Sequence, residues 1–431
     1  MRKIEKVAVL GSGVMGSRIA CHFANIGVEV LLLDIVPREV NAKEQAKGLT
    51  LESKSVRNRI VNDALTFATK SNPSPIYHKS FLSRIQTGNF DDDLSKIEKV
   101  DWIIEVVVEN LDIKKKVFTN VEKYRTPGTL ITSNTSGIPM ELMLEGRSED
   151  FQKHFCGTHF FNPPRYLKLL EIIPSTKTDK IVVDFFMKYG EQFLGKTTVL
   201  CKDTPAFIAN RIGIYTIMQT LKVVKDLGLT VEEVDKLTGP VIGRAKSATF
   251  RTMDVVGNDT LIKVADNLYA GLVNDEERDI FKKAELLQKI EENQWLGDKT
   301  GQGFYKKTKV DGKTEILALN LSTFEYEPKS KVKFATLEAS KTIESLKPRF
   351  KVLLSGKDKA GDFYRQTFLN LFQYITNRIP EITDELYKID DALKAGFAWE
   401  IGPFEIWDCI GVNKGVEMME SMGVKPADWV K

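Results

Sequence analysis

A glycine-rich turn near the N-terminus constrains the fold of this 431-residue chain more than any other feature. Residues 7–10 form an apolar run typical of a buried strand, and Gly11-Ser12-Gly13-Val14-Met15-Gly16 follows it and opens a helical pattern. In this context the first glycine permits a tight turn, the second admits a pyrophosphate, and the third allows close helix–strand packing. The helix N-terminus would direct N–H donors at the phosphates. All six residues are predicted to bind a dinucleotide, the alternative being a glycine-rich turn that binds none.

A carboxylate at the end of the second apolar run predicts which of two dinucleotides, NAD or NADP, the chain binds. Residues 28–35 form this run, and Asp34 lies 23 positions after Gly11. A carboxylate there would accept a hydrogen bond from a ribose 2′-OH and would repel a 2′-phosphate. We therefore expect NAD as cofactor rather than NADP, although Arg38 nearby could weaken the preference.

Strand and helix signals alternate through the first 200 residues. Nearly continuous apolar runs of this kind are typical of strands buried on both faces of a mostly parallel sheet. An α/β, Rossmann-type, doubly wound domain is predicted for residues 1–200. Residues 36–98 are polar and helical in pattern, interrupted by Asn72-Pro73-Ser74-Pro75, and we expect a helical hairpin there. The expected strands are 7–10, 28–35, 101–108, 129–133, 154–161 and 167–173.

The rest of the chain is mostly helical. A helical domain is predicted for residues 201–305, with Thr230 capping its second helix. Asp311-Gly312 between two extended runs indicates a hairpin, so residues 306–355 are interpreted as a hairpin and linker. Residues 356–431 form a second helical unit. The spacing Phe250-x-x-x-Asp254-x-x-Gly257 recurs at positions 404, 408 and 411, which suggests a duplication.

Composition excludes several classes of protein. The content is 42% hydrophobic and 28% charged, as in ordinary globular proteins, and length alone predicts about three domains. With 62 Lys and Arg against 59 Asp and Glu, the net charge of +3 favours neither nucleic acid nor a membrane surface as partner. No signal-peptide pattern is present, so a cytoplasmic location is expected. The four cysteines predict free thiols and no metal site: Cys21, Cys156, Cys201 and Cys409.

One histidine of four has a chemical partner at a predictable distance along the chain. His159 precedes Asn162-Pro163-Pro164, which favours a turn, and the apolar run 167–173 follows. If the two runs fold back about residue 165, Glu171 lies opposite His159. A carboxylate beside an imidazole fixes its tautomer and stabilises the imidazolium, as a general base for alcohol oxidation requires. The alternative is a histidine satisfied within an aromatic strand.

Several ordered motifs carry a family resemblance. They are the glycine turn, Ser133-Asn134-Thr135-Ser136, His159-Phe160-Phe161-Asn162-Pro163, Glu171, and the segment 201–211, Cys-Lys-Asp-Thr-Pro-Ala-Phe-Ile-Ala-Asn-Arg. Their order and spacing resemble the L-3-hydroxyacyl-CoA dehydrogenases over residues 4 to about 305. The segment 397–405 resembles a second copy of that family's C-terminal domain.

The resemblance implies residue roles. His159 would be the general acid/base, Glu171 its orienting partner, and Ser136 and Asn210 hydrogen-bonding groups around the reacting oxygen. The implied cofactor contacts beyond the glycine turn are Asp34, Glu109, Lys114, Ser136, Asn162 and Lys299. A glutamate and lysine five positions apart are otherwise typical of a solvated helix start. The phosphates of coenzyme A would meet Lys47, Lys54 and Arg57, although a basic helix face is more often simply solvated.

The resemblance also implies a reaction and partners. The reaction is NAD-dependent oxidation of (S)-3-hydroxyacyl-CoA to 3-ketoacyl-CoA, as in fatty acid β-oxidation. The Asn72–Pro75 insertion and residues 239–254 look like the dehydrogenase half of fusions with an enoyl-CoA hydratase. We therefore expect a hydratase partner or a missing fused domain, and either a homodimer or a monomer whose duplicated helices mimic a dimer. The alternatives are a dehydrogenase of a small free hydroxy acid and a non-catalytic NAD-binding subunit.

Overall fold

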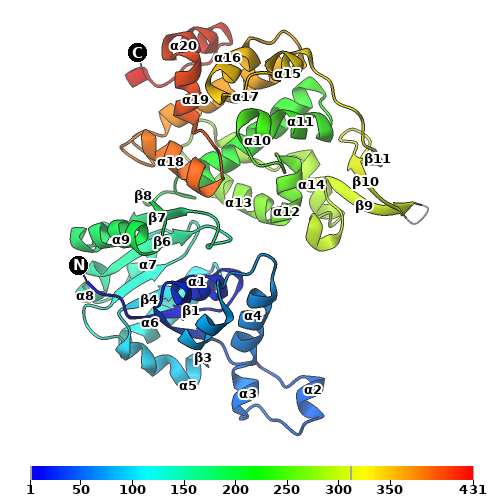
Figure 1. Cartoon of the computed structure of the whole chain (residues 1–431). Helices are drawn as coiled ribbons and strands as arrows, with labels where there is room; N and C mark the ends of the chain where they lie inside the picture. The colour runs from blue at the N-terminus through cyan, green and yellow to red at the C-terminus, as the bar shows by residue number, and fades with distance from the viewer. Residues whose placement is uncertain (1, 311–312, 431) are drawn as a thin grey trace. The chain divides into compact units, whose positions relative to one another are not determined.

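The computed structural model describes residues 2–310 and 313–430, which belong to two compact units, Met1–Phe207 and Ile208–Lys431 (Figure 1). The strands of the first unit are β1 (Lys6–Leu10), β2 (Glu29–Asp34), β3 (Ile85–Asn89), β4 (Trp102–Glu105), β5 (Leu130–Ser133), β6 (Phe155–Phe160), β7 (Leu169–Pro174) and β8 (Thr197–Leu200). Its α-helices are α1 (Val14–Asn25), α2 (Ala42–Gln45), α3 (Lys54–Arg57), α4 (Arg59–Lys70), α5 (Phe90–Asp93), α6 (Leu111–Tyr124), α7 (Met140–Leu144), α8 (Glu149–Lys153) and α9 (Lys180–Gln192).

The eight strands form one sheet in the order β3-β2-β1-β4-β5-β6-β7-β8. Neighbouring strands are parallel except β6 and β7, which are antiparallel. The doubly wound Rossmann-type domain expected from the strand–helix alternation is therefore confirmed.

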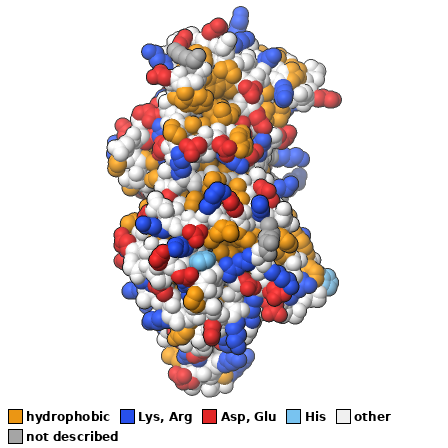
Figure 2. Space-filling model, turned by 90° about the vertical axis from the view of Figure 1, so that its left-hand side faces the viewer, with side chains coloured by type: hydrophobic (Ala, Val, Ile, Leu, Met, Phe, Trp, Pro, Cys, Tyr) orange, Lys and Arg blue, Asp and Glu red, His pale blue; other side chains and the backbone are white. Residues whose placement is uncertain are grey.

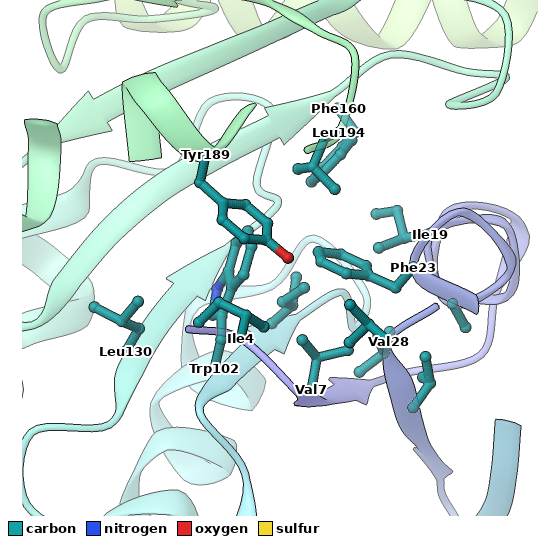
Figure 3. Close-up of a cluster of buried hydrophobic side chains, with 14 of the residues drawn as sticks. Ile4, Val7, Ile19, Phe23, Val28, Trp102, Leu130, Phe160, Tyr189 and Leu194 are labelled. Carbon is teal, nitrogen blue, oxygen red and sulfur yellow. The ribbon is translucent and has the colours of Figure 1, made fainter. Parts of the chain in front are cut away.

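The sheet is buried on both faces, since its central strands β1, β4, β5, β6 and β7 are buried at almost every position. On one face, Phe23 of α1 packs edge-on against Trp102 of β4, and Phe186 of α9 lies against the same indole (Figure 3). On the other, Phe118 of α6 contacts Phe155 of β6. The two helical layers fix the positions at which the strands end.

Three strands differ from expectation. β3 lies within the range predicted to be a helical hairpin, and it pairs in parallel with β2. Its sequence, Ile-Gln-Thr-Gly-Asn, lacks an apolar run because it is an edge strand with exposed positions. β8 has only four residues, too few for a pattern. β4 ends at Glu105, three residues earlier than expected.

The second unit is mostly helical, as predicted. It contains α10 (Ala209–Leu227), α11 (Val231–Thr238), α12 (Phe250–Val256), α13 (Asn258–Gly271), α14 (Glu285–Glu292), α15 (Ala335–Ser340), α16 (Leu346–Ser355), α17 (Lys359–Asn377), α18 (Tyr387–Gly396), α19 (Pro403–Ile410) and α20 (Val412–Ser421). Thr230 caps α11 through a capping box with Glu233, as expected.

A three-stranded sheet and two short helices occupy the segment expected to be a hairpin and linker. β9 (Tyr305–Val310) pairs antiparallel with β10 (Lys313–Leu319), which pairs with β11 (Tyr326–Pro328). The predicted turn residues 311–312 lie outside the described residues. The segment 320–360 was expected only to connect, yet α16 packs against α17 and α19.

The suspected duplication is visible in the helices. A shift of 154 residues aligns the succession α10 to α13 with the succession α17 to α20. Gly257 (φ 104°, ψ 120°) and Gly411 (φ 92°, ψ 132°) occupy equivalent junctions in backbone conformations that favour glycine. At the position equivalent to Asn210 the second copy has Tyr364, so the two copies are not chemically alike.

The surface mixes charges of both signs. On the face shown in Figure 2, Lys and Arg side chains are interspersed with Asp and Glu, as the small net charge implies. Within residues 2–310 and 313–430, every helix is too short or too polar to cross a lipid bilayer.

Candidate active site

The sheet register brings the predicted site segments of the first unit to one edge. Leu10, Glu105, Ser133 and Gly157 lie in one row across β1, β4, β5 and β6. The four strands are parallel, so the segments that follow this row all leave the sheet at its carboxyl edge. These segments hold the glycine turn, Glu109, Ser136 and His159. Ligands of open α/β sheets bind at this edge.

The glycine turn has the geometry that a pyrophosphate needs. Gly11 has a φ of 106°, and a Cβ there would lie 2.6 Å from the Val106 carbonyl oxygen. A Cβ on Gly16 would overlap the backbone of Gly11, whereas a Cβ on Gly13 would meet nothing within 4 Å. Helix α1 begins after Gly13 with no side chain capping its N–H groups. These donors and the open space at Gly13 fit a dinucleotide phosphate.

Asp34 lies beside this turn. Its Oδ2 accepts hydrogen bonds from the backbone N–H of Ser12, at 2.6 Å, and from the Ser12 hydroxyl. The carboxylate is thus held at the end of β2 next to the turn, where the ribose contact was predicted. The register of β1 and β2, which pairs Leu10 with Leu33, makes this contact possible.

His159 and Glu171 face each other as the turn predicts. They are directly paired in the antiparallel register of β6 and β7, and His159 Nδ1 donates to Glu171 Oε2 at 2.8 Å. Both side chains are buried, with exposed fractions of 8% and 0%. Because the carboxylate binds Nδ1–H, the neutral imidazole has its lone pair on Nε2. The spatial pairing is confirmed, while the catalytic role stays a prediction.

Aromatic rings and an asparagine fix the imidazole. The rings of Phe161 and Phe207 lie 4.6 Å and 5.7 Å from it, both edge-on. Asn134 Oδ1 accepts a hydrogen bond from the N–H of Phe160 at 2.8 Å and so ties β6 to the segment after β5. Phe207 has a φ of 53° and is fully buried. These contacts restrict the ring to one orientation.

Glu109 and Lys114 do not form a solvated helix start. Lys114 is 1% exposed, and its ammonium lies 2.8 Å from Glu105 and 3.3 Å from Glu109. Glu109 Oε1 accepts from the hydroxyl of Thr135 at 2.6 Å and from the N–H of Ser136 at 2.9 Å. Burial alone would raise the pKa of Glu109, but the Lys114 charge and these hydrogen bonds lower it. The network therefore holds an ionised carboxylate against Ser136.

The remaining predicted residues differ in their surroundings. Asn162 is the second residue of the segment joining β6 to β7, and Asn210 lies in the first turn of α10 in the second unit. Lys299, also in the second unit, is ion-paired with Asp259. The contacts of these three with a ligand stay predictions.

The basic side chains expected to meet coenzyme A are not equivalent. Lys47 and Lys54 are exposed. Arg57 instead binds both oxygens of Asp92, at 2.6 and 2.8 Å, so its charge is already compensated. A helix-face pattern cannot reveal a partner 35 residues away, and the contact of Arg57 with coenzyme A stays a prediction.

Sequence reasoning missed three residues that shape this edge. Glu105 is the counter-ion of Lys114, and its isolation within the apolar run 102–108 was an available signal. Phe207 touches the imidazole from the end of the first unit. Lys196 binds the backbone beyond His159, and no sequence pattern marks it because its partners are carbonyl groups.

The fold and the edge define a Rossmann-type dinucleotide-binding scaffold, and comparison with known proteins gives its family. A family model described as the NAD binding domain of 3-hydroxyacyl-CoA dehydrogenase matches residues 6–204, and the model of that family's C-terminal domain matches residues 207–307. The chain belongs to the 3-hydroxyacyl-CoA dehydrogenase family.

Relatives of different lengths are similar in sequence to this chain. A "Probable 3-hydroxyacyl-CoA dehydrogenase" of Bacillus subtilis is 48% identical over 430 residues, which are 100% of this chain and 54% of the relative. A protein of the same name from Deinococcus radiodurans is 46% identical over 71% of this chain and 84% of its own length. A "Putative fatty acid oxidation complex trifunctional enzyme" of Rickettsia felis is 31% identical over 94% of this chain and 53% of the relative. The chain spans about half the length of the first and third.

A solved structure supports the architecture. The crystal structure of 3-hydroxybutyryl-CoA dehydrogenase from Escherichia coli matches with a TM-score of 0.69 over 100% of this chain and 98% of that chain. Its sequence identity of 20% makes this a likeness of fold alone.

Proposed function

We propose that the protein catalyses the reversible NAD-dependent oxidation of (S)-3-hydroxyacyl-CoA thioesters to 3-ketoacyl-CoA. One observation carries the proposal: an imidazole held by a buried carboxylate lies at the same sheet edge as the glycine turn. Family membership supports the substrate class.

His159 performs the proton transfer in this proposal. Glu171 accepts the Nδ1 hydrogen bond, which leaves the Nε2 lone pair to take the proton of the substrate hydroxyl. The carboxylate then stabilises the imidazolium that forms. NAD, held at the glycine turn, would supply the acceptor for the hydride that leaves the carbon carrying this hydroxyl. Acid/base assistance of this kind contributes about 10²–10⁴ in rate.

Other residues hold the reactants. The N–H groups at the start of α1 bind the pyrophosphate, and Asp34 accepts from the adenosine ribose. Ser136 donates a hydrogen bond to the reacting oxygen, and for Asn210 the family resemblance implies the same role. Glu109 positions Ser136, and the buried Lys114 acts through Glu109.

We further propose a thioester substrate and a functional partner. Lys47 and Lys54 are the exposed cations that would meet the phosphates of coenzyme A. The name of the Rickettsia felis relative supports an association with enoyl-CoA hydratase activity, supplied by a partner or a fused domain. The stacked rings of Tyr215 in α10 and Tyr374 in α17, 3.7 Å apart, support a monomer whose two helical copies replace a dimer contact.

A substrate screen tests the proposal. NADH oxidation is followed at 340 nm with 3-ketoacyl-CoA esters of increasing chain length and with the matching free 3-keto acids. We expect turnover with the thioesters only. Turnover with free acids alone would support the hydroxy-acid alternative, and NADH binding without turnover would support a non-catalytic subunit.

The pairing of His159 with Glu171 has its own test. Glu171→Gln should lower kcat and move its pH dependence, because the imidazolium loses its counter-ion. An unchanged pH profile of kcat would contradict the assigned role of Glu171.

A further inference from the structure

Two cations hold the segment that reverses the chain between β6 and β7. The Lys196 ammonium donates to the carbonyl oxygens of Pro164 and, at 2.9 Å, of Leu167. The Arg165 guanidinium donates to the carbonyl oxygen of Ser74 at 2.5 Å. The segment that sets the position of Glu171 opposite His159 is thus attached to the rest of the unit on two sides.

The contacts of Lys196 indicate that its role is this attachment. It is 6% exposed and forms no ion pair with any carboxylate among the described residues. Its neighbours are the two carbonyl groups and the face of Phe160, 5.7 Å away. Burial lowers the pKa of Lys196 to about 8, so the buried charge is costly. The two carbonyl groups and the ring of Phe160 offset part of this cost.

Arg165 connects the same segment to the Asn72–Pro75 insertion. Its guanidinium lies 4.5 Å from the Tyr77 ring and 5.1 Å from the Tyr166 ring. The insertion is in turn fixed by Asn25, whose side-chain amide donates to the carbonyl oxygen of Pro75 and accepts from the N–H of Tyr77. Asn25 is the last residue of α1, the helix that follows the glycine turn.

The segment that carries Lys196 is also attached to α1. His22 Nε2 donates to the carbonyl oxygen of Leu194 at 3.0 Å, two residues before Lys196. Leu194 and Phe160 belong to the same buried cluster as Ile19 and Phe23 of α1 (Figure 3). The last two turns of α1 therefore reach the β6–β7 segment by two separate routes.

We propose that Lys196 and Arg165 are positioning residues for the His159–Glu171 pair. In an antiparallel pair a slip of one residue turns every side chain to the other face, so the register must be fixed where the chain reverses. The two cations fix it by binding main-chain carbonyls on the segment and on the insertion. The expected effect of the two residues on kcat rests on the proposed dehydrogenase function. Their effect on the position of the His159 imidazole can be measured without turnover.

The experiment compares matched variants of the full chain. Lys196→Met and Arg165→Met remove the attachments, while Lys196→Arg and Arg165→Lys keep the charge. Arg84→Met is the control, because Arg84 also stacks on an aromatic ring and donates to a carbonyl of α1, but does not touch the segment. The readouts are kcat and KM with a 3-ketoacyl-CoA ester, NADH affinity, and imidazole NMR signals of 15N-histidine-labelled protein, in which four histidines are few enough to resolve.

We expect kcat to fall by about 10- to 100-fold in Lys196→Met, as for a small misplacement of reacting groups, with NADH affinity unchanged. Arg165→Met should give a smaller fall, the charge-conserving variants should recover part of the loss, and Arg84→Met should match the wild type. The His159 signals, assigned with His159→Gln, should shift in both methionine variants while those of His154 stay in place.

Unshifted His159 signals with wild-type kcat in folded Lys196→Met and Arg165→Met would overturn the inference. If Lys196→Met does not fold, the Arg165 variants decide alone by the same criteria. A wild-type enzyme without turnover on any 3-ketoacyl-CoA would refute the proposed function, and the imidazole signals would still test the positioning role.

Discussion

Buried charge serves different purposes in the two units. In the first unit, His159 and Glu171 pair on adjacent strands beside a sheet edge that is built for ligands. In the second unit, Asp275 accepts from Arg211 of α10, from Arg378 after α17 and from the hydroxyl of Tyr374, within a helical interior. In the proposed reaction the first pair orients a proton-transfer group, whereas the second cluster joins the two helical copies.

The surroundings explain the difference. The first pair has one carboxylate for one imidazole, both in hydrogen-bond contact. The second cluster has two guanidinium groups, and Arg211 Nη1 and Arg378 Nε have no partner among the described residues. An incompletely satisfied cluster is tolerated where it fixes how helices pack, but a proton-transfer group needs a defined tautomer. Burial of charge alone therefore does not identify a catalytic site.

Exchanging His159 for glutamine should give the largest functional effect. His159→Gln removes the base, so kcat should fall by about 10²–10⁴. NADH affinity, measured by fluorescence titration, and the urea midpoint should stay close to wild type. A variant with near-normal kcat would remove His159 from the mechanism.

Removing the central carboxylate of the second cluster should affect stability instead. Asp275→Asn removes the buried carboxylate that Arg211 and Arg378 share and leaves them only the more exposed Glu381 and Glu276, so the free energy of unfolding should fall by about 3 kcal/mol. Glu276→Gln is the matched control, since Glu276 binds the same Arg378 from a position 46% exposed and should cost less than about 1 kcal/mol. Urea unfolding measures both, and equal losses would contradict the central role of Asp275.

Acid should change the stability contributed by two buried groups, Asp390 and His22, in opposite directions. Burial raises the pKa of Asp390 to about 7 from 3.8, so the folded state binds this proton more tightly than the unfolded state. Relative to Asp390→Asn, the wild type should gain about 4 kcal/mol as the pH falls from 7 to 4. Unfolding free energies of both proteins at the two pH values check the sign.

Protonation of His22 should lower the free energy of unfolding as the pH falls, which is the opposite of the effect expected for Asp390. Burial and, secondarily, the Lys196 charge lower the pKa of His22 to about 4, so the stability that depends on neutral His22 is fully present above pH 6.5. It is lost as the pH falls towards 4. Relative to His22→Gln, which keeps a donor for Leu194, the wild type should lose about 3 kcal/mol between pH 7 and 4. A constant difference across this range would mean that His22 is not shielded from protonation.

The smallest effect is expected for cofactor choice. Asp34→Asn removes the charge that repels a 2′-phosphate but keeps an acceptor for Ser12. The ratio of kcat/KM with NADPH to that with NADH should rise, with little change in stability. No change in this ratio would refute the ribose contact.

These comparisons also show what the sequence could predict. The pairing of His159 with Glu171 was predictable because a double proline marks the reversal and strand side chains alternate with a period of two. The glycine turn was predictable because Gly11 and Gly16 have steric reasons that the structure confirms, while Gly13 leaves open space for a ligand. Local chemistry and simple periodicity were sufficient in both cases.

Other features depended on contacts that leave no local pattern. Lys114 appears solvated in sequence because its counter-ion, Glu105, is hidden in an apolar strand. Arg57 was expected to be available because Asp92 belongs to a separate element. β3 was missed because its residues are stabilised as an edge strand by pairing with β2 and not by their own propensity.

The attachments of α1 have a consequence for protein engineering. Asn25 and His22 make the last turns of this helix depend on residues 74–77 and on Leu194, far along the chain. A chimera that transplants only the first strand–turn–helix from another dehydrogenase, in order to change its coenzyme, would leave both docking points without their counterparts. Such grafts should carry the insertion and the segment before β8 with them.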